Sequence, residues 1–215
     1  MDSMQMSGST VAINNRLNLD DMMFTYGIRM NYDLVMDLNA LPIPIRTGQI
    51  GNQPQLDFFP WYYFPVIVPT QQHPVVKNLN AIKTQFVSSI DTVRAAGVKK
   101  TVLLKTSAYS RTVNTPAVIS LELLRQEPDE SMYRGPSQVI AVLLEGRFVS
   151  NYKNRMPAEI ANDKQMGFSE YSKPTSMIFV ADGDVIRNQF RKGEPLPLGY
   201  DQFTRETFGN KAFIL

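Results

Sequence analysis

The chain contains no cysteine and only one histidine among its 215 residues. The missing cysteines exclude disulfides, thiolate metal sites and cysteine nucleophiles. The single histidine, His73, precedes Pro74 in a proline-rich stretch, and no sequence feature brings it near a serine that it could activate. Cysteine hydrolases and enzymes of the Ser–His type are therefore disfavoured.

The chain also has little excess charge of either sign. Lys and Arg total 22 against 20 Asp and Glu, which gives a formal net charge of +2, and the charges are scattered along the sequence. A nucleic-acid partner is not expected, because binding to a polyanion needs a concentrated positive surface. The glycine patterns G-x-x-x-x-G-K-[ST] and G-x-G-x-x-G are both missing, so no cradle for nucleotide phosphates is expected. We expect no cofactor and no enzymatic activity.

Long apolar runs are missing as well. The longest charge-free apolar stretch, Phe58 to Pro69, contains three prolines and is far shorter than the ~20 residues of a membrane-spanning helix. The N-terminus has no basic segment followed by an apolar one, so no secretory signal is expected. We expect both ends of the chain to be internal points of a longer protein.

Hydrophobic residues make up 43% of the sequence, which is enough to build the core of a single domain over residues 1–215. Several short apolar runs predict strands, and three of them are continuous, as is typical of strands covered on both faces. The predicted strands are Ile82 to Ser88, Lys100 to Thr106, Val139 to Glu145 and Met177 to Ala181. We expect a layered α/β domain in which helices cover both faces of a sheet.

Other segments have local signals. Residues 19–26 are predicted to be a short helix, with Asn18 as its cap and Gly27 as its left-handed stop. The stretch from Ile28 to Thr47 is predicted to be an edge strand, because Pro42 and Pro44 exclude a helix and a central strand. A further helix is expected within residues 147–175, with a proline near its first turn and a glycine after its end.

Residues 48–74 combine seven Gly or Pro residues with a dense aromatic cluster. This composition predicts an irregular connection, held against the core by its aromatic side chains. Trp61, Tyr62 and Phe64 are therefore expected to be mostly buried. An alternative is that the aromatic residues form an exposed surface for a partner.

Two acidic residues follow the last predicted strand, and they are the first candidates for a functional site. Asp182 and Asp184 flank Gly183 in the position where α/β sheets bind ligands. The two carboxylates could hold a divalent metal ion for a metal-dependent hydrolase, although no third ligand is identifiable. The preferred interpretation is a tight turn in which Asp184 caps a helix that begins near Val185.

The second candidate site is the loop after the strand at residues 100–106. Ser107, Tyr109, Ser110 and Arg111 are expected to lie close together there and could bind an anionic group. An ordinary polar loop is the preferred interpretation, and no metal-binding, cofactor-binding or catalytic residue is assigned.

Segments spread over nearly the whole chain resemble the GldG family, the auxiliary, substrate-binding-like proteins of a gliding-motility ABC transporter in Bacteroidetes. The segments that carry the resemblance include FPWYYFP at residues 59–65, LLKTSAYSR at 103–111, ADGDVIRNQF at 181–190 and PLPLGYDQFTRETFGNK at 195–211.

The resemblance implies a fold similar to the flavodoxin-like and class I glutamine amidotransferase-like folds, of which this chain would be a portion. It also implies a membrane-anchored parent protein whose large domain lies at the periplasmic face of the inner membrane. The implied partners are the permease and ATPase subunits of the same transporter. An amidotransferase activity would need a cysteine nucleophile, which the chain lacks, so we expect a binding or structural role in transport or surface assembly.

Overall fold

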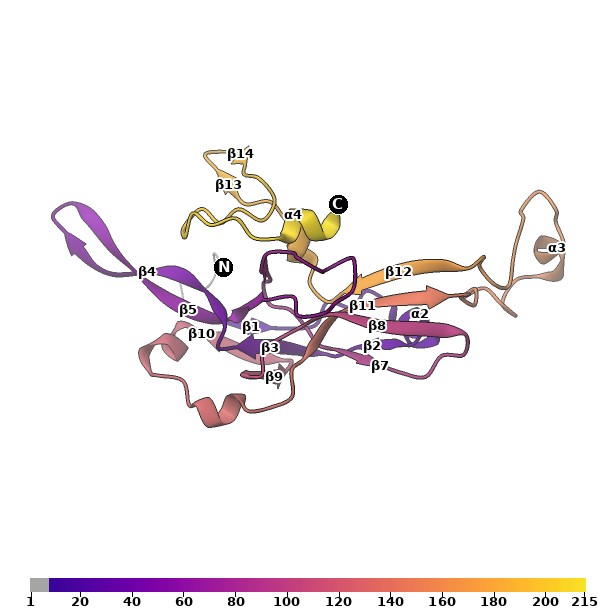
Figure 1. Cartoon of the computed structure of the whole chain (residues 1–215), viewed down its shortest axis with the longest axis horizontal. Coiled ribbons are helices and arrows are strands. Elements are labelled where there is room, and N and C mark those ends of the chain that lie inside the picture. The colour runs from indigo at the N-terminus through magenta and orange to yellow at the C-terminus, as the bar shows by residue number, and fades with distance from the viewer. Residues whose placement is uncertain (1–7) are drawn as a thin grey trace.

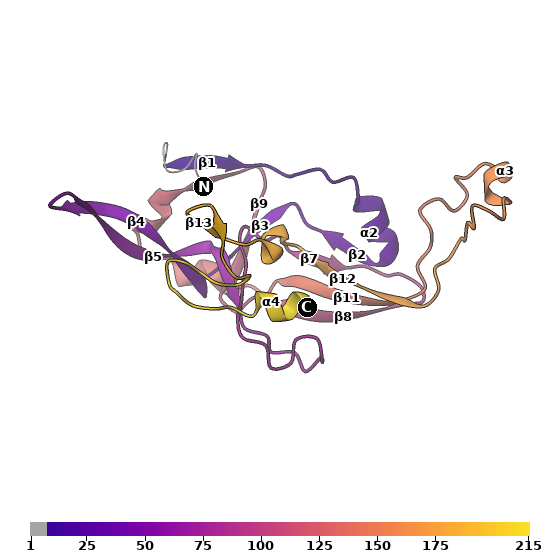
Figure 2. The same cartoon turned by 90° about the horizontal axis from the view of Figure 1, so that it is seen from above.

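The computed structural model describes residues 8–215, which form an elongated body built mainly of strands (Figure 1 and Figure 2). The strands are β1 Ser9–Ala12, β2 Ile28–Met30, β3 Asp33–Asp37, β4 Ala40–Ile50, β5 Gln53–Ile67, β6 Ile82–Lys83, β7 Ile90–Thr92, β8 Val98–Lys105, β9 Ser110–Asn114, β10 Ala117–Ser120, β11 Val139–Gly146, β12 Thr175–Val180, β13 Phe190–Arg191 and β14 Glu194–Pro195. The α-helices are α2 Asp20–Tyr26, α3 Ala158–Ala161 and α4 Asn210–Ile214, and the 3₁₀ helices are η1 Leu121–Arg125, η2 Glu130–Tyr133 and η3 Gly183–Ile186.

The strands form several small sheets in which every pair is antiparallel. Two sheets have three strands, in the orders β12-β11-β8 and β4-β5-β6. The remaining strands form the pairs β1-β10, β2-β7, β3-β9 and β13-β14. Figure 1 shows the tip of the β4–β5 hairpin and the loop that carries α3 at opposite ends of the long axis, with β13, β14 and α4 above the central strands.

The expected layered α/β fold, similar to flavodoxin-like and class I glutamine amidotransferase-like folds, is wrong. The longest helix in residues 8–215, α2, has seven residues, and no layer of helices covers a sheet. The physical reason is the direction of the strands. Parallel neighbours need crossover connections, usually helical, whereas β8, β11 and β12 are antiparallel neighbours and need none.

The three continuous apolar runs are strands, as the sequence predicted. They correspond to β8, β11 and β12, and β11 lies between the other two. The residues from Ile140 to Leu144 are all buried, so both faces of β11 are covered. By contrast, β12 is at the edge of the sheet and exposes 44% of Ile178, so the expectation of two covered faces is wrong for this strand.

The expected irregular connection at residues 48–74 is also wrong, because β5 is the longest strand of the structure with 15 residues. Its prolines are accommodated by the pairing with β4, in which Pro42 lies opposite Pro60. Register shifts on β4 between Ala40 and Pro42 and between Arg46 and Gly48 interrupt the ladder beside these prolines. The predicted edge strand at Ile28 to Thr47 is divided among β2, β3 and β4, and only its proline-bearing part, β4, pairs with β5 as an edge strand.

The local helix signals had mixed success. α2 ends at Gly27, which has φ 102° and donates its N–H to the carbonyls of Met23 and Phe24, so the predicted stop is confirmed. The residue at the cap position is Leu19 and makes no side-chain hydrogen bond, so the predicted role of Asn18 is wrong. α3 is a single turn that ends well before Gly167, and only Ile82 and Lys83 of the predicted strand Ile82 to Ser88 are in a strand.

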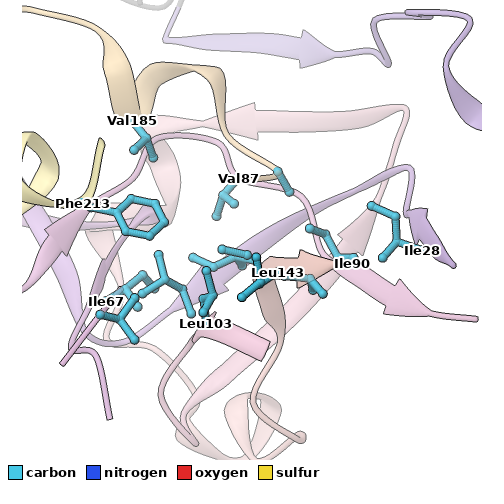
Figure 3. Close-up of a cluster of buried hydrophobic side chains, with 14 of the residues drawn as sticks. Ile28, Ile67, Val87, Ile90, Leu103, Leu143, Val185 and Phe213 are labelled. Carbon is cyan, nitrogen blue, oxygen red and sulfur yellow. The ribbon is translucent and has the colours of Figure 1, made fainter. Parts of the chain in front are cut away.

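Two clusters of buried side chains form the core. One cluster joins β11 and β8 to more distant segments through residues such as Ile67, Val87, Leu103, Leu143 and Phe213 (Figure 3). The other cluster is aromatic and is centred on Trp61, Tyr62, Tyr63 and Phe64 of β5, which are all buried. The prediction that Trp61, Tyr62 and Phe64 are buried is confirmed, and it is a strand, rather than a loop, that they hold in place.

Replacing Trp61 with alanine should destabilise the folded chain strongly. The indole is fully buried and packs against the Tyr63 ring. The two ring centroids are 5.4 Å apart. Loss of its contacts and the resulting cavity should lower the free energy of unfolding by about 3–5 kcal/mol, measured by urea denaturation. Phe58→Ala on the same strand is the matched control, because Phe58 is 51% exposed and should cost less than about 1 kcal/mol. Equal losses in the two variants would contradict the central place of Trp61 in the core.

Candidate functional site

The first candidate site, at Asp182 and Asp184, is a turn that leads from β12 into η3. Asp182 caps η3, because its Oδ1 accepts a hydrogen bond of 2.7 Å from the backbone N–H of Asp184. The expectation that Asp184 is the cap is therefore wrong. The helix begins at Gly183, earlier than the sequence predicted, so the residue before it becomes the cap.

The second carboxylate oxygen of Asp182 joins two distant parts of the chain. It accepts a hydrogen bond of 2.8 Å from the backbone N–H of Gln85, which follows β6. Burial raises the pKa of Asp182 to about 6, and the two backbone N–H groups act in the opposite direction by stabilising the charged form. Both oxygens of this buried side chain therefore already serve the fold.

The partner of Asp184 is a cation of the protein itself. Its Oδ1 lies 3.2 Å from Nη1 of Arg187. Among residues 8–215, no group of three or more His, Cys, Asp or Glu side chains is arranged to hold a metal ion. The metal-dependent hydrolase alternative thus gains no third ligand from the described part of the chain.

A cleft of about 710 Å³ lies beside this turn, between the N-terminal segment and the body. Its wall is predominantly apolar, and the carboxylates of Asp33 and Asp182 are part of the lining. Asp33 is also buried, and it accepts hydrogen bonds from the backbone N–H and the hydroxyl of Ser89 at 2.8 and 2.6 Å. The carboxylates of Asp33 and Asp182 thus accept hydrogen bonds from the protein's own donors.

The second candidate site does not form as a unit. Ser107 donates from its backbone N–H and its hydroxyl to the buried carboxylate of Asp37, at 2.8 and 2.6 Å. Ser110 is buried and shares a hydrogen bond of 2.7 Å with the hydroxyl of Thr106. Tyr109 is 56% exposed. Of the four predicted residues, Arg111 is left as the candidate for binding an anion. Its guanidinium lies over the ring of Tyr133, and its Cζ is 5.1 Å from the ring centroid.

One buried ion pair was not predicted. Lys83 and Asp201 lie 3.6 Å apart, between Nζ and Oδ2, and are 6% and 1% exposed. Lys83 also donates to the carbonyl of Tyr200, and Asp201 accepts from the side chain of Gln189 and the backbone N–H of Thr204. The pair fastens the C-terminal segment to β6. No sequence pattern could have found it, because its members are far apart in the chain.

A family model described as an ABC-type uncharacterized transport system matches residues 1–215, the full length of the chain. Residues 8–215 thus form a β-rich domain in which buried carboxylates accept hydrogen bonds from the protein's own groups. The chain belongs to this family, and it is therefore an auxiliary component of an ABC-type transport system. No curated protein and no solved structure matches it.

The family assignment indicates an association with a membrane. No helix within residues 8–215 has the length and apolar character that a membrane crossing requires.

The raised pKa of Asp182 predicts a pH dependence of stability that Asp182→Asn removes. An unfolded aspartate titrates near 3.8 and the folded one near 6, so the folded state favours the protonated form. Its stabilising contribution is complete below pH 4 and is lost as the pH rises to about 6. The loss corresponds to about 3 kcal/mol between these limits, on the order of 1.36 kcal/mol per pKa unit.

Denaturation of both proteins in urea between pH 4 and 7.5 measures this difference. Asp184→Asn is the control, and its pH profile should follow that of the unchanged chain. Parallel profiles for the unchanged chain and Asp182→Asn would show that the Asp182 pKa is not raised.

Proposed function

We propose that this chain is a non-enzymatic, extracytoplasmic domain of a GldG-type transporter component, linked to gliding motility or surface assembly. In this proposal, its partners are the permease and ATPase subunits of the same ABC transporter. The parent protein is anchored in the membrane, and the domain lies at the periplasmic face of the inner membrane. The family match along the whole chain supports the transporter role, and the quoted segments support the closer relationship to GldG.

The observation that carries the proposal is the β4–β5 hairpin. It projects from the body at one end of the long axis (Figure 1 and Figure 2). Residues 47–56 at its tip have no charged side chain, while Ile50 and Leu56 are 71% and 49% exposed. β6 pairs only with Val66 and Ile67 of β5, so no third strand supports the tip. Two-stranded ribbons are marginally stable alone, and contact with a partner subunit would stabilise this one.

The non-enzymatic part of the proposal is supported by the places of the reactive residues. Nδ1 of His73 accepts a hydrogen bond from the backbone N–H of Val75, at 3.3 Å, within its own turn. Ser107 donates to Asp37, a carboxylate that is itself held by backbone N–H groups. Within residues 8–215, no serine hydroxyl is hydrogen-bonded to a histidine, so the arrangement of Ser–His catalysis is not formed there.

A photo-crosslinking residue in place of Ile50, in the full-length protein in its own cells, should form adducts with the permease subunit. The tip is exposed and lies far from the body, so a crosslinker there reaches only a docked neighbour. The same residue in place of Lys192, in the turn between β13 and β14, is the positional control and should give few adducts. The proposal fails if the adducts at position 50 contain no transporter subunit.

The double variant Ile50→Asp/Phe58→Asp should reduce co-purification with the permease at least tenfold while leaving the melting temperature nearly unchanged. Both side chains are more than half exposed in the free domain, so their replacement costs little stability. Ile186→Asp, at a side chain that is 61% exposed in η3, is the control and should co-purify normally. Normal co-purification of the double variant would rule out the hairpin as the docking element.

A further inference from the structure

Arg111 of β9 is a cation that the fold uses only weakly. It lies opposite Met36 of β3 in the strand pairing, and its Nη2 is 3.5 Å from the Met36 sulfur. Its Nη1 is 3.9 Å from the sulfur of Met132, and its Cζ is 5.1 Å from the ring centroid of Tyr133. Its Nε is buried and has no hydrogen-bond partner. The side chain is half-buried, and besides the Tyr133 side chain its acceptors within residues 8–215 are thioether sulfurs, which are weak ones.

Among residues 8–215, no carboxylate forms an ion pair with Arg111. The other arginines of the described chain include three that do pair with acids: Arg29 with Asp91, Arg125 with Glu122, and Arg187 with Asp184. Those three guanidinium groups are exposed, where water would serve them equally well. Arg111 is half-buried and has no counter-charge within residues 8–215, and a partly desolvated charge favours an anionic partner.

Three tyrosine side chains surround this position. The rings of Tyr62 and Tyr133 meet edge to face at 5.9 Å between centroids, and Tyr63 is the next residue of β5. Burial raises the pKa of both Tyr63 and Tyr133, and the charge of Arg111 opposes that effect for each, which places the guanidinium near both hydroxyls. The guanidinium and the phenol groups therefore lie close together here.

We propose that Arg111, together with the hydroxyls of Tyr62, Tyr63 and Tyr133, forms a binding site for a small carboxylate anion. The planar guanidinium matches the two oxygens of a carboxylate, and a phenol hydroxyl can donate to either oxygen. One guanidinium balances one negative charge, so a monocarboxylate fits the site better than phosphate, which carries nearly two charges at neutral pH. The site is separate from the hairpin tip and does not depend on the transporter role.

Thermal unfolding of the chain in increasing acetate, at constant ionic strength set with chloride, tests the proposal. The melting temperature should rise along a saturable curve. Arg111→Met should abolish this rise, and without acetate its melting temperature should equal or exceed that of the unchanged chain, because an unpaired cation has been removed. Arg111→Lys keeps the charge without the planar fork and should weaken the acetate affinity at least tenfold. Arg125→Met, at an exposed arginine, is the control and should respond to acetate normally.

Tyr133→Phe provides a second test that does not depend on how Arg111→Met folds. It keeps the ring under the guanidinium and removes only the hydroxyl, so the response to acetate should weaken while the melting temperature without acetate stays unchanged. A titration with phosphate compares the two kinds of anion, and the proposal expects the weaker response from phosphate.

Three results would overturn the carboxylate site. The first is an equal acetate response in the unchanged chain and in Arg111→Met. The second is a chain that shows no response to acetate while Arg111→Met melts at a lower temperature, which would make Arg111 a purely structural cation–π partner of Tyr133. The third is a stronger response to phosphate than to acetate, which would replace the carboxylate with a different anion.

Discussion

Buried carboxylates that accept hydrogen bonds from backbone N–H groups hold this structure together. The sheets have only two or three strands, so many buried N–H groups lie outside any ladder and need another acceptor. The carboxylates of Asp33, Asp37 and Asp182 accept hydrogen bonds from backbone N–H groups. The donors are Ser89, Ser107 and Gln85, respectively. Each bond joins segments far apart in the sequence. These carboxylates therefore accept hydrogen bonds that strand pairing would provide in a larger sheet.

The same constraint shapes what the protein can do. A carboxylate whose oxygens accept backbone N–H groups is a poor metal ligand, since binding a metal competes with those bonds. Asp182 is the clearest case, because it is the residue that the sequence placed in a possible metal site. The two recognition elements that we propose, the uncharged hairpin tip and the cation at Arg111, lie outside these hydrogen bonds. A binding role in a transport system agrees with that distribution.

The strand β5 connects the two parts of the core. Trp61 at its centre belongs to the aromatic cluster, and Ile67 at its end belongs to the aliphatic cluster around β11. Beyond the core, the strand continues into the exposed hairpin, so one element links the buried interior to the proposed docking surface.

The sequence by itself determined the features that depend on neighbouring residues. It identified β8, β11 and β12 from their apolar runs, α2 from Gly27, and the burial of Trp61 from its aromatic context. The tertiary structure alone decided the direction of the strands, because an apolar run indicates that both faces are covered but does not tell which neighbours cover them. It also decided the roles of Asp182, Asp201 and Arg111. Their partners are distant in the chain, as Gln85 is from Asp182, and only folding brings such groups together.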